Sequence, residues 1–169
     1  NLDIVNLDII TDRDLKYLIA LYDGEIRYTD EIFGRFFNWL RQQGLMDKTL
    51  LIITSDHGEE FKEHGYFLHR VLYRETLEVP LIIRWPEKVP QGRVISGQIR
   101  LLDLMPTVLD LIGIPITSQC QGMSVADAIT RTGHIFLSAY SEYPWSEKFM
   151  APEIRGQYSL TTRKWLSLI

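Results

Sequence analysis

The first part of the chain carries apolar residues at helical spacing. Between Thr11 and Gly44 they recur every three or four positions, at Leu15, Leu18, Tyr22, Ile26, Phe33, Phe36, Phe37 and Leu40. Thr11 followed by Asp14 is typical of an N-terminal capping box, and Gly44 is a suitable C-terminal stop. The pattern predicts one long amphipathic helix, or two helices with a slight break near Gly34.

Two short apolar runs rich in β-branched residues predict buried strands. The first, Thr49–Thr54, ends abruptly in the sequence SDHG, and the second, Val79–Pro86, is closed by proline. Continuous apolar runs suit strands that are covered on both faces, as in parallel sheets flanked by helices. We therefore expect these two strands in such a sheet.

The remaining pattern completes an α/β order of elements. An apolar stripe predicts a helix over Leu101–Ile112, and residues His134–Tyr140 predict a third strand. Residues Tyr158–Thr162 and Trp165–Ile169 are expected to form the two strands of a hairpin. Alternation of helices and buried strands favours the α/β class.

Candidate chemistry follows the first buried strand. Asp56 and His57 stand where the strand ends, and ligands of open α/β sheets gather outside the carboxyl ends of strands. A carboxylate oxygen and an imidazole nitrogen together can hold a divalent cation, without specifying which one. The alternative is an aspartate that caps the next turn and a histidine bonded to the backbone. Spacing alone leaves both open.

Two further imidazoles follow in a polar, glycine-punctuated segment. His69 is a functional candidate because Val71 then returns the chain to the core, so the side chain before that return can point back at the strand end. For His64 a functional and a structural role both stay open. For the glutamates of this segment a solvated loop or helix face is favoured over metal ligation; they are Glu59, Glu60 and Glu63.

Composition narrows the class of protein. The 169 residues suffice for one domain with a sizeable core, and a formal net charge of -4 argues against a nucleic-acid partner. The single cysteine, Cys120, excludes an intrachain disulfide and a multi-cysteine zinc site but leaves exported and cytoplasmic locations open. No apolar run approaches the ~20 residues of a membrane helix. Both ends of the sequence look cut from something longer.

A longer series of segments resembles a known family. SDHGEEFKEHGYFLHRVLYRETLEVPLIIRWP resembles the sulfatases of the alkaline-phosphatase-like superfamily, as do LYDGEIRYTDEIFGRFFNWLRQQGLMDKTLLIIT upstream and LLDLMPTVLDLIGIPITSQCQGMSV downstream. The resemblance implies an α/β fold with a mixed or parallel sheet flanked by helices. Residues 1–140 would be the C-terminal part of the catalytic domain, and residues 141–169 the truncated beginning of a small antiparallel subdomain.

The resemblance also implies roles for four residues. Asp56 and His57 match the family's second pair of metal ligands, usually around calcium, although many members have asparagine at the second position. His69 falls where many sulfatases place a lysine that contacts the sulfate and the nucleophile. His64 matches the histidine of the frequent EHG triplet and is expected to line the pocket. Both histidines are candidates for catalysis.

The family's nucleophile is missing from this sequence. It is a formylglycine made from Cys or Ser in a C/S-x-P-S-R motif, whereas Cys120 lies in SQCQGMS. The first aspartate pair of the metal site also belongs to the family's N-terminal region. The resemblance thus implies a fragment of an enzyme that hydrolyses sulfate esters of a sugar or aryl group, and we expect the isolated fragment to be inactive.

Three alternatives remain. Phosphonate or phosphate diester hydrolases and phosphoethanolamine-type transferases of the same superfamily share the strand and SDHG arrangement, and their N-terminal nucleophile motif would distinguish them. The third is a non-catalytic scaffold whose site has decayed, which metal titration of the complete protein would reveal.

Overall fold

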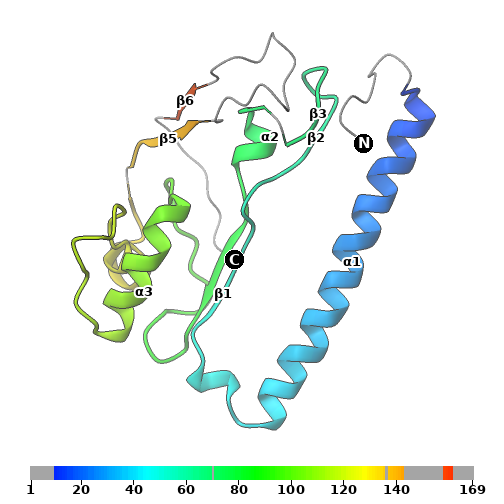
Figure 1. The fold of residues 1–169 in the computed structure, drawn as a ribbon. Helices are drawn as coiled ribbons and strands as arrows, with labels where there is room; N and C mark the ends of the chain where they lie inside the picture. Colours follow the sequence, from blue (N-terminus) through cyan, green and yellow to red (C-terminus); the bar gives the residue numbers. More distant parts are fainter. Residues whose placement is uncertain (1–9, 70, 136, 143–157, 162–169) are drawn as a thin grey trace.

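The long N-terminal helix forms without interruption. The computed structural model describes residues 10–69, 71–135, 137–142 and 158–161 (Figure 1). Helix α1 (Asp12–Gln42) begins with the predicted capping box: the Thr11 side chain accepts from the Asp14 N–H, and the Asp14 carboxylate accepts from the Thr11 N–H at 3.0 Å. Beyond its end, Gly44 adopts a φ of 65°, a conformation that glycine reaches at little cost. The one-helix prediction is confirmed.

The two buried strands pair with each other. After the short turn η2 (Met46–Lys48), β1 (Leu51–Thr54) lies beside β4 (Leu81–Arg84), and the pairing is antiparallel. The α/β class is confirmed, but our expectation of a parallel arrangement for these two strands is wrong.

The segment that joins these strands explains their direction. It consists of a hairpin, β2 (Glu60–Phe61) with β3 (Phe67–Leu68), and the single helical turn α2 (Arg74–Leu77). All of these lie at one end of β1 and β4 (Figure 1). A parallel neighbour would need a crossover back along the sheet, usually a helix. Here the connecting segment brings the chain back to the sheet at the same end at which β1 finished, so β4 runs antiparallel to β1.

The predicted second helix is present. The turn η3 (Leu101–Asp103) runs into α3 (Leu104–Ile112), which ends where Gly113 adopts a φ of 78°. A further turn, η4 (Ala128–Thr132), follows. The core lies between β4, α3 and the residues around η4 in two clusters. One cluster contains Leu81, Ile95, Ile99, Val125 and Ile129, and the other contains Trp85, Leu111 and Ala126.

The third strand lies later than predicted. Strand β5 (Ala139–Glu142) pairs antiparallel with β6 (Tyr158–Thr161), whereas His134 makes only an isolated parallel bridge with Ser96. The first half of the predicted C-terminal hairpin is therefore a strand, with β5 as a partner. Its second half, Trp165–Ile169, lies outside the described residues.

A buried carboxylate ties α3 to the chain that follows it. The Asp103 side chain is fully buried and accepts from Nη2 and Nε of Arg100 at 2.7 and 2.9 Å and from the Met123 N–H at 2.9 Å. Burial alone would raise the pKa of the Asp103 carboxyl, but these donors outweigh it and the pKa is lowered.

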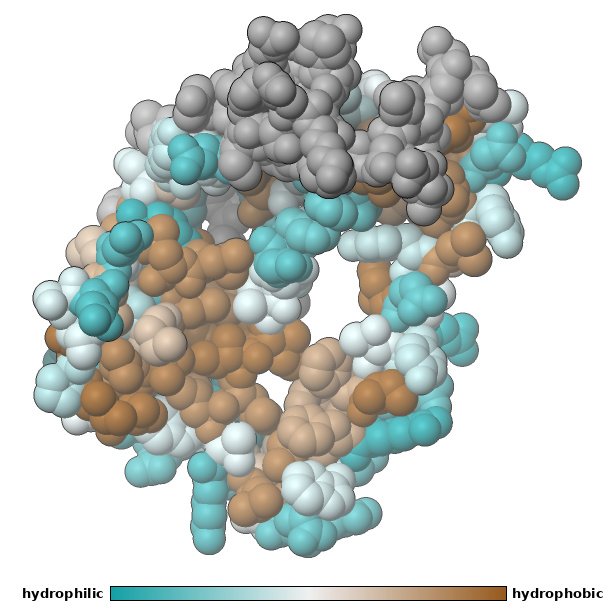
Figure 2. Space-filling model, in the orientation of Figure 1, coloured by the Kyte–Doolittle hydropathy of each residue, from teal (hydrophilic) through white to brown (hydrophobic). Residues whose placement is uncertain are grey.

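Helix α1 stands apart from this core. Leu40 is its one buried residue, and an open gap separates much of the helix from the sheet in Figure 2, with apolar side chains along it. Close to its N-terminal half, the Tyr22 and Phe61 rings meet edge to face at 5.2 Å. Among the described residues, no helix combines the length and hydropathy that a membrane crossing needs.

Candidate functional site

The SDHG turn directly after β1 is held by its own side chains and by α2. Ser55 Oγ donates to the His57 carbonyl at 2.7 Å, and the Gly58 N–H donates to the Thr76 carbonyl at 2.9 Å. A Cβ on Gly58 would lie 2.0 Å from the Glu75 carbonyl oxygen. Only glycine lets this turn approach α2 so closely, which places Asp56 and His57 at the strand end.

Asp56 and His57 present two acceptors to the same space. Asp56 Oδ1 lies 3.8 Å from His57 Nε2, and the aspartate side chain is 87% exposed. His57 Nδ1 lies 2.8 Å from the Gly58 carbonyl. A carbonyl only accepts, so Nδ1 carries a proton, and in the neutral imidazole Nε2 then has a lone pair. The carboxylate oxygen and this lone pair can be bridged by one cation with bonds of roughly 2.0 to 2.6 Å.

The turn-capping alternative is also visible, and it does not conflict with metal binding. The His57 N–H donates to Asp56 Oδ1 at 3.1 Å, and the His57 ring is bonded to backbone. These contacts orient both side chains, and Asp56 Oδ1 keeps a second lone pair that it can offer to a cation together with His57 Nε2. Within the described residues, no group of three or more His, Cys, Asp and Glu side chains is placed to hold a metal ion. Asp56 and His57 are thus two candidate ligands for a cation.

His69 reaches the same place from the end of β3. Its ring stacks on that of His57, with centroids 3.8 Å apart and planes at 24°, and its Nδ1 lies 3.5 Å from Glu59 Oε2. The preceding Leu68 has a φ of 70°, a left-handed conformation that non-glycine residues rarely adopt. Such strain is often found at functional sites, and here it turns His69 towards the SDHG turn.

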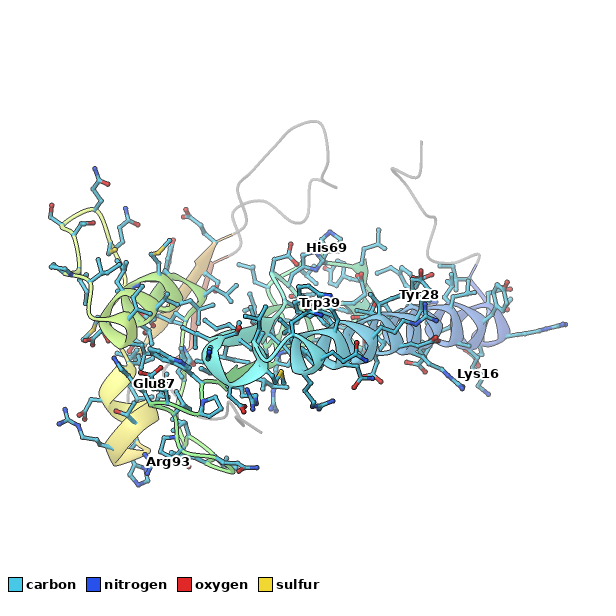
Figure 3. The ribbon with its side chains drawn as sticks, turned by 90° about the horizontal axis from the view of Figure 1, so that it is seen from below. Lys16, Tyr28, Trp39, His69, Glu87 and Arg93 are labelled. Carbon is cyan, nitrogen blue, oxygen red and sulfur yellow. The ribbon has the colours of Figure 1, made fainter. Side chains whose placement is uncertain are left out.

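Asp56, His57 and His69 line one cavity of about 470 Å³. Arg100, Tyr140 and Ser141 also line it, and most of the remaining lining is aliphatic. The volume is typical of small-molecule sites, in which a few polar groups orient a ligand among apolar walls. Figure 3 shows His69 well away from Glu87 and Arg93.

His64 lies beside this cavity and is not among the residues that line it. Its Nε2 is 3.1 Å from Glu75 Oε2, and its ring stacks on Tyr73 with centroids 3.8 Å apart. The pKa of the Glu75 carboxyl is lowered, first by a hydrogen bond from its own backbone N–H and further by His64. The structure thus brings three of the four predicted residues together and ties the fourth to α2.

The glutamates of the segment differ from the solvated surface that their polarity suggests. Glu60 is fully buried, and its Oε1 accepts from the N–H groups of His64 and Tyr66 at 2.9 and 3.2 Å. The Glu59 side chain is only 16% exposed. The expectation is wrong for these two and correct for Glu63, which is exposed. The glycine turn inside this polar segment indicates a hairpin, and that hairpin is the sequence signal that could have revealed the burial of Glu60.

The fold and this strand-end pair define an alkaline-phosphatase-like α/β protein, and sequence comparison gives its family. The sulfatase family model matches residues 8–114, and a model of the C-terminal region of N-sulphoglucosamine sulphohydrolase matches residues 62–168. The first match covers more than half of the chain. The chain belongs to the sulfatase family.

Individual relatives support the same assignment. Arylsulfatase K of Bos taurus is 31% identical over 158 residues, 92% of this chain and 29% of the relative. A solved complex of a protein with its substrate D-glucosamine-2-N,6-O-disulfate superimposes with a TM-score of 0.72 at 31% identity, covering 81% of this chain and 28% of the other. The phosphonate monoester hydrolase of Silicibacter pomeroyi has a TM-score of 0.72 at 30% identity, covering 82% and 28%. The chain spans less than a third of each relative.

Proposed function

We propose that the complete protein is a metal-dependent sulfuric ester hydrolase and that this chain supplies half of its metal site. The observation that carries the proposal is the pair of acceptors, Asp56 Oδ1 and His57 Nε2, 3.8 Å apart at the edge of a cavity. The similarity to arylsulfatase K and to a protein that binds a disulfated glucosamine supports the choice of sulfate esters.

Each residue has a stated role in this proposal. Asp56 and His57 hold a divalent cation, calcium by family resemblance, together with carboxylates from outside this chain. When bound, that ion acts as a Lewis acid and as a template for the ester. His69 donates a hydrogen bond to the sulfate group, which stabilises charge as the ester bond breaks. His64 holds the hairpin beside the cavity or relays protons.

The nucleophile is proposed to come from outside this chain. By family resemblance it is a formylglycine, and the 169 residues contain no C/S-x-P-S-R motif. We therefore expect no turnover from the isolated chain. Sulfatase activity that scales with this chain and disappears in Asp56→Ala would contradict that expectation.

The proposed substrate is a sulfate ester on a sugar or aryl group. Tyr140 and Ser141 line the same cavity as Asp56 and His57, and Tyr140 is 57% exposed. A ring of this kind can pack on the apolar face of a sugar, while hydroxyl groups orient it.

A phosphonate or phosphate ester hydrolase is the second candidate. It is favoured by one observation: the phosphonate monoester hydrolase superimposes with the same TM-score, 0.72, as the complex with the sulfated glucosamine. The complete protein should be assayed with matched aryl sulfate and aryl phosphonate esters. A higher kcat/KM on the sulfate supports the first proposal, and the reverse order supports the second.

Metal binding is tested on the complete protein by calorimetry with calcium. Asp56→Ala should weaken calcium binding and lower kcat/KM by at least about 100-fold, because a hard cation loses a charged oxygen ligand. Asp23→Ala, on the exposed part of α1, is the control for loss of one carboxylate. Unchanged calcium affinity in Asp56→Ala contradicts the proposal, and an intact protein that binds no calcium favours a scaffold.

A further inference from the structure

Glu59 has an environment that the proposed division of roles leaves unexplained. Its Oε2 faces His69 Nδ1 at 3.5 Å, and its Oε1 is buried with no hydrogen-bond partner among the described residues. Removing a carboxylate oxygen from water without a partner is unfavourable for folding. Neighbouring Glu60 also has one buried oxygen, Oε2, without a partner among the described residues, but its Oε1 accepts from two backbone N–H groups and so stabilises the hairpin.

The imidazole of His69 is the polar group that Glu59 contacts in the described part of the chain. One face of that imidazole rests on the His57 ring, and its Nδ1 edge faces the Glu59 carboxylate. A carboxylate only accepts hydrogen bonds, so it favours the tautomer with the proton on Nδ1. A ring held on one face and at Nδ1 has its second nitrogen, Nε2, in a defined direction.

We propose that Glu59 is a positioning residue that acts through His69. It holds the Nδ1 edge of the imidazole and so directs the other edge into the cavity that His69 lines. This inference rests on the proposed function, because it assigns the direction of the group that meets the ester. The stack with His57 extends the effect to the metal pair, since tilting His69 would release one face of the His57 ring.

The identity of residue 69 explains why such a partner is needed. A lysine, which the family resemblance places here in many sulfatases, has three equivalent donors that rotate about one bond. A histidine has two distinct nitrogens and a plane, so its direction must be set by a neighbour. Glu59 is therefore matched to a histidine at this position.

The inference is tested first by the tautomer of His69. In the complete protein, ¹⁵N chemical shifts at a pH where the imidazole is neutral should place the proton on Nδ1. Glu59→Met removes the acceptor at similar length and should move the population towards the Nε2–H form, whereas Glu59→Gln keeps an acceptor and should retain much of the original population. Glu63→Gln, with the same charge change on an exposed residue of the hairpin, should leave the shifts of His69 unchanged.

Kinetics on the same proteins supply the second readout. Loss of a partner that orients a site imidazole typically costs about 10- to 100-fold. We expect Glu59→Met to lower kcat by about tenfold or more with little change in KM, and Glu59→Gln to recover part of the loss. A purely structural role would lower thermal stability without moving the tautomer.

Two results would overturn the inference. One is a wild-type His69 whose proton resides on Nε2, a measurement that needs no variant to fold. The other is a folded Glu59→Met protein with an unchanged tautomer or an unchanged kcat. If the complete protein hydrolyses no sulfate ester, the proposed function fails, and the tautomer measurements still decide whether Glu59 orients His69.

Discussion

Single residues at the strand end act through contacts that tolerate little change. Gly58 is the clearest case, because any side chain there meets the Glu75 carbonyl. Glu60 is another, because one of its carboxylate oxygens accepts hydrogen bonds from the backbone N–H groups of His64 and Tyr66. In both cases the contacted atoms belong to backbone, which cannot adjust as a side chain would. Substitutions at these positions should therefore have larger effects than their modest change in volume suggests.

Gly58→Ala is expected to lower the free energy of unfolding by about 1 to 3 kcal/mol, because backbone must move away from the new methyl group. Denaturant titration of the 169-residue chain measures it. The control is Gly34→Ala in α1, where no atom lies within 4 Å of the added methyl group. That change should stabilise the helix by roughly 0.5 to 1 kcal/mol. Equal stability of Gly58→Ala and wild type would show that the turn does not require the close approach.

Glu60→Ala is expected to cost about 1 to 3 kcal/mol, since the buried N–H groups of His64 and Tyr66 lose their acceptor. Amide hydrogen exchange should become faster at these two positions in particular. Glu63→Ala serves as the control, because it removes a bond at the exposed surface, where water replaces the acceptor. Unaltered exchange at His64 and Tyr66 would mean that Glu60 does not organise the hairpin.

Among the elements, α3 depends on a charged contact as well as on apolar packing. The Arg100–Asp103 pair joins the first turn before α3 to the Met123 backbone, so it links two segments separated by the whole helix. A fully buried carboxylate with several donors stabilises only as long as it is ionised.

This contact predicts how stability depends on pH. The folded-state pKa of Asp103 is lowered below its ordinary value, which is about 3.9 in an unfolded chain. Its contribution is therefore fully present above that value and is lost as the pH falls through the lower folded-state pKa. Asp103→Asn should lower the free energy of unfolding by roughly 3 kcal/mol at pH 7. Because the variant has no carboxyl group to titrate at this position, its stability should also decline less as the pH falls below about 4. Thermal unfolding as a function of pH tests this; parallel curves for the two proteins would contradict it.

The direction of β4 shows how far element prediction can go. Apolar composition located β1 and β4, because burial on both faces is a local property of the run. The apolar composition does not specify whether the two strands pair parallel or antiparallel. That depends on whether the chain between the strands crosses the sheet or folds back, and here a two-strand hairpin and one helical turn keep it at one end.

For the whole molecule, the apolar face of α1 is the main feature left exposed in this structure. Ile26, Phe33 and Phe36 are 54%, 39% and 43% exposed. Patches of this kind favour association or dye binding. We expect the isolated chain to bind a hydrophobic dye and to associate as its concentration rises.

The double variant Ile26→Gln, Phe36→Gln should reduce both effects, measured by fluorescence and sedimentation. Lys16→Gln on the same helix is the control, since it changes charge and leaves the apolar residues in place. Dye binding equal to wild type in the double variant would locate the exposed apolar surface elsewhere.

The sequence by itself determined the properties that depend on neighbours along the chain. The bounds of α1 and the end of β1 just before the SDHG turn follow from spacing, capping and turn chemistry. The order of the segments along the chain carries the resemblance to the sulfatases, which the family model matches. Only the tertiary structure decided the antiparallel sheet, the burial of Glu59 and Glu60, and the stacking of His69 on His57. These arise because a polar segment folds back over a strand end, and a contact between residues brought together by such folding leaves no periodic signal in the sequence.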